Sequence, residues 1–199
     1  MIIGITGGIG SGKTYIANRL KTEGYPVYNC DDEAKRLMNQ NGEIRTQLVQ
    51  LLGPGAYLAD GQLNKQVVAA YLFASPSHAA LVNAIVHPVV KDDFRQWSSR
   101  QKAPHCFMES AILYEAKFEP VVDKIILVYA DEQTRLQRAM KRDQATGQQI
   151  RARMAQQLPP EQLRTKADYI VENSAAADTP AEISRLLHWL TTLAPATQA

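Results

Sequence analysis

One eight-residue segment near the start of the chain limits its fold more than any other. Residues 7–14 read GGIGSGKT, the pattern G-x-x-x-x-G-K-[ST], and directly follow the apolar run IIGI at residues 2–5. In that position the pattern is typical of a loop that joins a strand to a helix and cradles phosphate. Glycines allow successive backbone N–H groups to point at phosphate oxygens, and the following helix adds the positive end of its dipole. The segment therefore predicts an α/β protein with a nucleotide site.

Within this loop, Lys13 is expected to reach the β- and γ-phosphates, and the Thr14 hydroxyl is expected to hold Mg²⁺. The alternative is a glycine-rich turn without a ligand, but such a turn does not require Lys and Thr at these positions. The motif identifies the nucleotide and not the reaction. The residues predicted to bind the nucleotide here are Gly8, Ile9, Gly10, Ser11, Gly12, Lys13, Thr14 and Tyr15.

Length and composition narrow the class of protein. The chain has 199 residues and is 45% hydrophobic, which suffices for one full core with a small appended region. Its net charge of +2 is too small to indicate nucleic acid as a partner. We find no signal peptide and no apolar run of about 18 residues, so we expect no membrane span. Two distant cysteines favour a reducing compartment, so we predict a cytoplasmic protein. We expect its partners to be small molecules. We expect the last residues, from Ala194, to fray.

Short apolar runs alternate with amphipathic segments along the chain, which is typical of β-α-β units with a parallel sheet. The expected strands cover residues 2–6, 26–30, 105–109, 124–129 and 168–172. About seventy residues, 31–102, separate the second and third strands, far more than one crossover helix requires. Apolar residues near a helical period predict helices over 43–52, 64–73 and 76–100. We interpret this insertion as a substrate-binding lobe; a decoration without function is the alternative.

Several acidic residues follow expected strands, where a carboxylate could serve phosphoryl transfer. Asp31 could accept a hydroxyl proton or bind a magnesium-bound water. Asp31 or Asp32 could also cap the next helix, and the two roles are compatible. Glu109 ends the third strand and resembles an acid that holds Mg²⁺ through water. Glu115 follows a few residues later as a candidate substrate-binding residue or a solvated loop carboxylate.

The segment 131–157 is the main basic cluster. Asp131 is a good N-cap, and Arg135, Arg138 and Arg142 share one face of the following helix. After a break at Gly147 come further arginines, so two helices with inward-facing arginines could close over a triphosphate. A solvated face paired with nearby acids is the alternative, and Arg138 and Arg142 are the preferred candidates.

Two further polar residues are candidates for binding. His87 precedes Pro88, which is expected to kink the long helix or start a new one. The imidazole could touch a phosphate or ribose, and a core or capping histidine is the alternative. Asn173 lies just past the last strand and could hydrogen-bond a nucleotide base or simply form a turn.

Taken together, these residues resemble the dephospho-CoA kinase family over nearly the whole chain, roughly residues 2–193. Among the single motifs, only the phosphate loop is specific by itself. The order and spacing of all the motifs together carry the rest of the resemblance. They are ITGGIGSGK at 5–13, Asp31 followed by AKR at 34–36, His87 with Pro88, ILYE at 112–115, Arg138, Arg142 with Asp143, Gln157 and Asn173.

The resemblance implies transfer of the ATP γ-phosphoryl group to the 3′-hydroxyl of the dephospho-CoA ribose, with Mg²⁺ as cofactor. It implies a P-loop kinase-like, three-layer α/β fold: a five-stranded parallel sheet with a helical insertion and a lid. The corresponding parts are a core (1–30, 103–137, 158–199), a helical CoA-binding domain (31–102) and a lid (138–157). We expect a monomer or weak homo-oligomer.

The resemblance also implies roles for single residues. Asp31 matches the general base, and Arg138 and Arg142 match the lid arginines, so the predicted catalytic set is these three with Lys13. Asp31, His87 and Glu115 are the predicted substrate-binding residues. The chain departs from the family at Asn29, where an aspartate is usual, at Tyr15, and at Ala111, where proline is common.

Other functions fit the phosphate loop alone. Another small-molecule or nucleoside-monophosphate P-loop kinase is the first alternative. A GTP-dependent switch requires an Asn-Lys-x-Asp motif, and Asn64-Lys65-Gln66-Val67 lacks the aspartate. A nucleotide-binding regulator without catalysis does not require Lys13, Thr14, Asp31 and the lid arginines together.

Overall fold

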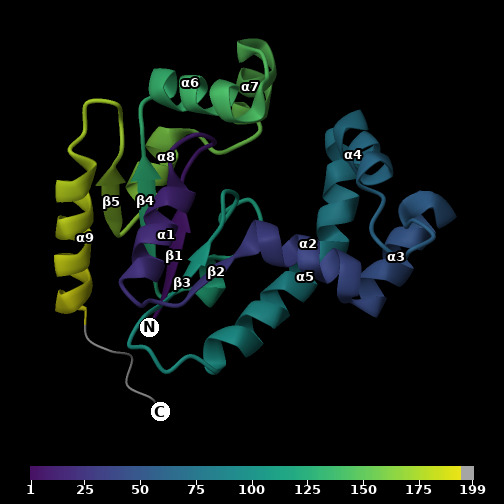
Figure 1. Ribbon diagram of the computed structural model, residues 1–199, viewed down its shortest axis with the longest axis horizontal. Coiled ribbons are helices and arrows are strands. Elements are labelled where there is room, and N and C mark those ends of the chain that lie inside the picture. Colours follow the sequence, from purple (N-terminus) through teal and green to yellow (C-terminus); the bar gives the residue numbers. More distant parts are fainter. Residues whose placement is uncertain (194–199) are drawn as a thin grey trace. The chain divides into compact units, whose positions relative to one another are not determined.

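The computed structural model describes residues 1–193, and its strands and helices alternate as the sequence predicts (Figure 1). Each predicted strand end lies within one residue of the observed one. The strands are β1 (Ile2–Thr6), β2 (Val27–Asn29), β3 (Cys106–Glu109), β4 (Lys124–Tyr129) and β5 (Tyr169–Glu172). The fraying expected from Ala194 onward concerns residues outside the described ones.

The helices that precede β3 are α1 (Lys13–Thr22), α2 (Cys30–Gln40), α3 (Gly42–Leu52), α4 (Lys65–Ala74) and α5 (Pro76–Ser99). Those that follow β3 are α6 (Glu132–Asp143), α7 (Gly147–Met154), α8 (Pro160–Lys166) and α9 (Thr179–Thr192). Short 3₁₀ turns lie at Pro54–Ala56 and Glu119–Val121. No helix within residues 1–193 has the length and apolar character that crossing a membrane demands.

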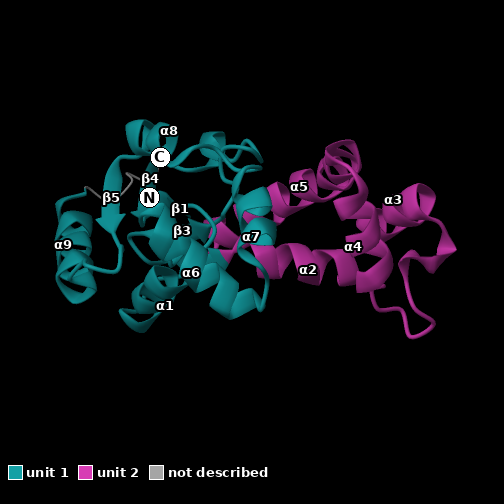
Figure 2. Cartoon of the chain, turned by 90° about the horizontal axis from the view of Figure 1, so that it is seen from above, with its two compact units in different colours: residues 1–28, 101–199 teal, residues 29–100 magenta. Residues whose placement is uncertain are grey.

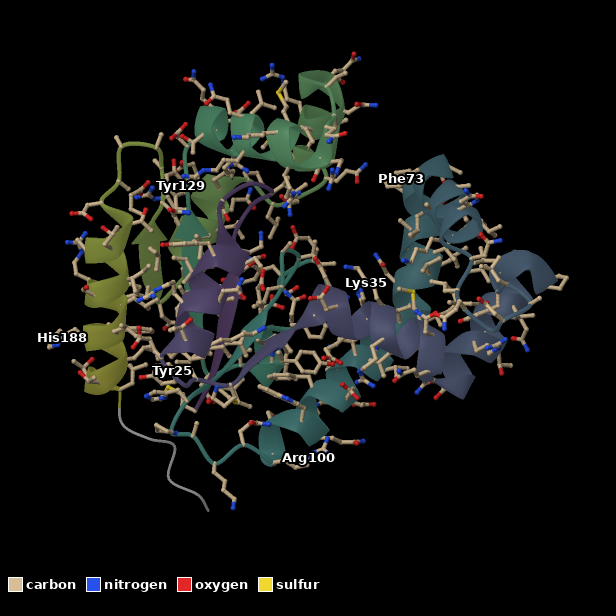
Figure 3. All side chains as sticks on the ribbon, viewed as in Figure 1. Tyr25, Lys35, Phe73, Arg100, Tyr129 and His188 are labelled. Carbon is tan, nitrogen blue, oxygen red and sulfur yellow. The ribbon has the colours of Figure 1, made fainter. Side chains whose placement is uncertain are left out.

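The strands form a five-stranded parallel sheet with the order β2-β3-β1-β4-β5. The central strand β1 pairs with β3, where Ile5 lies opposite Glu109, and with β4, where Ile5 lies opposite Ile126. Because the strands are parallel, the loops that follow β1, β3 and β4 leave the same edge of the sheet. Figure 3 shows Tyr129 at that carboxyl edge and Tyr25 at the opposite one.

The core lies between the sheet and the two helices α1 and α9. Each fully buried aliphatic side chain there stabilises the fold by roughly 1.5–3 kcal/mol. Helix α8 covers the other side of the strands from α1 (Figure 2). The buried members of this core include Ile3, Ile5, Ile16, Leu20, Phe107, Ile126, Val128, Val171, Leu186 and Leu190.

The chain divides into two compact units, coloured separately in Figure 2. The first, here the sheet unit, comprises Met1–Tyr28 and the described part of Gln101–Ala199. The second, here the helical unit, is Asn29–Arg100 and contains α2 to α5. Its interior is apolar, with Leu37, Ile44, Leu48, Val86 and Phe94 buried.

The structure corrects three details of the local predictions. Asn29, not Asp31 or Asp32, caps α2, since its side chain accepts a hydrogen bond from the Asp32 backbone N–H. Helix α5 continues through Pro88, so of the two predicted alternatives, a kink or a new helix, the new helix is wrong. Gly147 begins α7 and does not break the segment; the break is at 144–146, where Thr146 forms a capping box with Gln149.

Candidate active site

The phosphate loop leaves the carboxyl end of β1 and leads into α1. Gly12 caps this helix with φ +96°, a left-handed conformation that favours glycine. A Cβ at this position would lie 2.2 Å from Asn173 Nδ2, so space as well as backbone conformation requires glycine. The loop residues Gly8 to Thr14 thus have the strand-loop-helix setting that the motif predicts.

Lys13 reaches back over the loop that precedes it. Its Nζ donates hydrogen bonds to the carbonyl oxygens of Gly7, at 2.8 Å, and Gly8, at 3.1 Å. Lys13 is only 9% exposed. An ammonium held among loop carbonyls places a positive charge at the loop, and a phosphate oxygen is a suitable acceptor for such a group.

Thr14 and Glu109 form the second polar contact of the loop. The Thr14 hydroxyl donates to Glu109 Oε1 at 2.9 Å. Glu109 is buried and ends β3, the strand paired with β1, so the sheet register brings the two residues together. A hydroxyl beside a carboxylate is an oxygen donor set of the kind that Mg²⁺ prefers.

Asn173 connects the loop to the end of the sheet. Its Nδ2 donates to the Ser11 carbonyl at 2.7 Å, and its Oδ1 accepts from the Thr179 hydroxyl at 3.0 Å. Its own carbonyl accepts from Arg138 Nη1 at 2.7 Å. A cavity of about 370 Å³ opens beside this cluster. Its lining residues are Gly12, Tyr15, Arg138, Asn173 and Thr179.

The chain between α7 and α8 also contacts the loop. Ile9 N–H donates to Gln157 Oε1 at 2.8 Å, and Gln157 Nε2 donates to the Ala111 carbonyl at 3.1 Å. Glu115 is exposed, and its Oε1 accepts from the Leu158 backbone N–H at 2.9 Å. These bonds link the loop after β3 to the end of the basic segment.

The arginines of α6 and α7 have different surroundings. Arg138 donates to the Asn173 carbonyl beside the cavity. Arg142 instead forms a bidentate ion pair with Asp143, from Nε to Oδ1 at 2.6 Å and from Nη2 to Oδ2 at 3.0 Å. Arg153 Nη1 donates to the same carboxylate at 2.6 Å. The hydrogen bond from Arg142, reinforced by Arg153, lowers the pKa of Asp143 to about 2.

Two predicted residues belong to the helical unit. Asp31 is in the first turn of α2, where an anion is favoured, and its carboxylate accepts no hydrogen bond within residues 29–100. His87 is half-buried in α5. Burial, together with the positive charge of Lys91, lowers the pKa of His87, so its ring is neutral near pH 7.

Sequence reasoning missed part of this site. Thr179 was not predicted to line the cavity; the start of a helix, capped by Asp178, a few residues after the last strand is the signal that could have indicated it. Glu109 was predicted as an acid that holds Mg²⁺ through water but not as the partner of Thr14, and Gln157 was noted only within the resemblance. Both contacts depend on which segments the sheet brings together, which no local pattern specifies.

The sheet order, the GKT loop and the arginine-bearing helices after β4 define a P-loop kinase-like fold. The known proteins to which this chain is similar refine that class. A family model described as dephospho-CoA kinase matches residues 1–179. The chain belongs to the dephospho-CoA kinase family.

Individual relatives agree with the family. A dephospho-CoA kinase of Bacteroides fragilis is 42% identical over 189 residues, 94% of this chain and 92% of that protein. One from Porphyromonas gingivalis is 38% identical over 97% of this chain and 96% of that protein. The solved structure of TT1252 from Thermus thermophilus has a TM-score of 0.81 at 31% identity, with 96% of each chain covered. A shikimate kinase from Acinetobacter baumannii, at 16% identity and a TM-score of 0.57, shares the fold alone; 96% of this chain and 93% of that one are covered.

Proposed function

We propose that the chain transfers the γ-phosphoryl group of ATP to the 3′-hydroxyl of the dephospho-CoA ribose, with formation of CoA and ADP. The observation that carries the proposal is the Thr14–Glu109 contact of 2.9 Å beside the phosphate loop, in a chain of this family. Phosphoryl transfer depends mainly on positioning and electrostatic stabilisation, and these two residues and Lys13 supply groups of the required kind.

The nucleotide is bound by residues of the sheet unit. Loop N–H groups and Lys13 hold the phosphates, and the cavity beside Asn173 receives the nucleoside, with Gly12, Tyr15 and Arg138 at its walls. Thr14 would hold Mg²⁺ directly and Glu109 through water. When bound, the ion would neutralise charge on the phosphate oxygens.

The acceptor is bound by the helical unit. Asp31 accepts the proton of the ribose hydroxyl as a general base, a role that an exposed carboxylate with no partner in its own unit can fill. His87 binds the acceptor as a neutral hydrogen-bonding group, since its pKa is lowered. Glu115, from the loop after β3, is a further substrate-binding residue in this proposal.

Residues 138–157 act as a lid over the triphosphate. Arg138 and Arg142 stabilise charge that develops on the transferred group, and Arg142 exchanges Asp143 for phosphate as it does so. The remaining parts are the core (1–30, 103–137, 158–199) and the acceptor domain (31–102). Partners are small molecules only, the compartment is the cytoplasm, and the protein is a monomer or weak homo-oligomer.

An acceptor panel tests this proposal. The purified chain is incubated with ATP and Mg²⁺ together with dephospho-CoA, AMP or shikimate, and ADP release is measured for each. We expect kcat/KM for dephospho-CoA to exceed the others by about 10³-fold or more, because a site built to bind one acceptor rejects those that leave its polar groups unpaired. A preference for AMP or shikimate would instead identify another P-loop kinase.

A further inference from the structure

One arginine of α6 is buried against the phosphate loop, although the functional roles above do not use it. Arg135 is 7% exposed, and its Nε has no hydrogen-bond partner among the described residues. Within residues 1–193 no carboxylate forms an ion pair with its guanidinium. Buried charges are normally paired, because an unpaired one loses its hydration without compensation.

The position of this side chain relates it to the loop. A Cβ on Gly8 would lie 2.3 Å from Arg135 Nη1, and a Cβ on Gly10 would lie 2.2 Å from the Arg135 carbonyl oxygen. Backbone and guanidinium of Arg135 therefore pack directly on two of the loop glycines. The neighbouring arginine one turn later, Arg138, lines the cavity beside Asn173.

We propose that Arg135 is a positioning residue for the nucleotide phosphates: its uncompensated charge, held against Gly8 while its backbone packs on Gly10, raises the affinity of the loop for a polyphosphate. Over a short distance in a medium of low polarity, the attraction between such a charge and several phosphate charges is large. The bound polyphosphate thus provides the counter-charge that the protein lacks. This inference rests on the nucleotide binding in the proposed function and adds a residue to it.

A purely structural role makes different predictions. If Arg135 only fills space behind the loop, its loss should destabilise the free protein and weaken every nucleotide or nucleoside ligand alike. If its charge serves the phosphates, removal should weaken ligands in proportion to their phosphate number. It should also leave the free protein as stable as before or more so, because an unpaired buried charge has been removed.

Calorimetric titration with ATP, ADP and adenosine tests the proposal. The proteins compared are wild type, Arg135→Met, Arg135→Gln and Arg135→Lys. Thermal unfolding of each protein, with and without ATP, measures its stability. For the Met and Gln variants we expect the ATP Kd to rise about tenfold or more, the ADP Kd less, and the adenosine Kd by about twofold at most. The Lys variant, which keeps the charge, should stay within about threefold of wild type. Arg19→Met, an exposed arginine on α1, is the matched control and should change the ATP Kd by less than about twofold.

The outcomes separate this inference from the proposed function. Equal loss for ATP and adenosine, or no loss, in Arg135→Met and Arg135→Gln overturns the inference while wild-type activity on dephospho-CoA stands. Wild type that binds ATP but leaves dephospho-CoA unchanged contradicts the proposed function, and the phosphate-dependent loss in the variants still supports the inference. Wild type that binds no ATP overturns both.

Discussion

The phosphate loop and the helical unit hold their polar groups in different ways. In the loop, the partners come from far along the chain: Glu109 binds Thr14, Gln157 binds Ile9, and Asn173 binds Ser11. Each contact joins segments that only the folded chain brings together. The loop is therefore fixed by tertiary structure before any ligand arrives, a property that favours electrostatic stabilisation of a transferred group.

In the helical unit, most polar contacts are short-range. Asn29 caps its own helix through Asp32, and Asp32 in turn pairs with Lys35 one turn later. The bond from Arg36 to Asp93, at 2.9 Å, is a contact that does join distant segments. Phe73 near the end of α4 is 80% exposed (Figure 3). The helical unit thus has exposed side chains that its own fold does not use and that a ligand could contact.

This difference suggests that the two regions serve different steps. Changes in the loop should impair binding of the nucleotide and its metal, whereas a change at Asp31 should impair turnover with little effect on the nucleotide.

Asp31→Asn should have the largest effect. Loss of the general base should lower kcat by about 10²- to 10⁴-fold, while the ATP Kd stays within about twofold. Steady-state kinetics and calorimetry measure the two quantities. Asp32→Asn, in the same helical turn, is the control and should lower kcat by about fivefold at most. If the two variants exchange these behaviours, Asp32 is the base.

Glu109→Gln should come next. The amide still accepts the Thr14 hydroxyl but carries no charge for the metal, so kcat should fall by about 10²-fold and the Mg²⁺ concentration for half-maximal rate should rise. A magnesium titration of the rate measures both. Glu23→Gln, an exposed acid paired with Arg19, should change neither. An unchanged magnesium requirement in Glu109→Gln would remove the carboxylate from the metal site.

Gly12→Ala should cost stability as well as nucleotide affinity. The new methyl group would meet Asn173 Nδ2 at 2.2 Å in a left-handed backbone, so we expect a loss of at least about 2 kcal/mol in unfolding free energy. Gly24→Ala, with φ +87° and nothing within 4 Å, should show only the conformational part, about 1 kcal/mol. Gly42→Ala in the helical unit has neither penalty and should be neutral or stabilising. Chemical denaturation ranks the three, and equal losses would deny the crowding of the loop.

The smallest effect concerns the ion pairs of Asp143, at the end of α6, with Arg142 and with Arg153 of α7, and their dependence on pH. Because Arg142 and Arg153 lower the pKa of Asp143 from 3.8 to about 2, the pairs stabilise the fold above about pH 4 and are lost as the pH falls toward 2. Asp143→Asn should remove at most about 1 kcal/mol at pH 7 and flatten the acid limb of the stability curve. Urea denaturation between pH 2 and 7 checks this; an unaltered acid limb in the variant would contradict it.

The sequence alone predicted what local patterns determine. The GGIGSGKT segment predicted the loop, and short apolar runs predicted every strand within one residue of its ends. It did not predict that Arg135 is buried or that Thr179 lines the cavity, because both depend on packing between distant segments. The predicted cap of α2 was wrong because three polar residues within four positions, Asn29, Asp31 and Asp32, compete for one capping position, and Asn29 takes it.

The most direct test of the account is the identity of the product. The purified chain, ATP, Mg²⁺ and dephospho-CoA are incubated together, and the products are examined by mass spectrometry and phosphorus NMR. We predict equal amounts of ADP and CoA, with the new phosphate on the 3′-oxygen of the ribose. Consumption of ATP without CoA, or a phosphate at another position, would contradict the account.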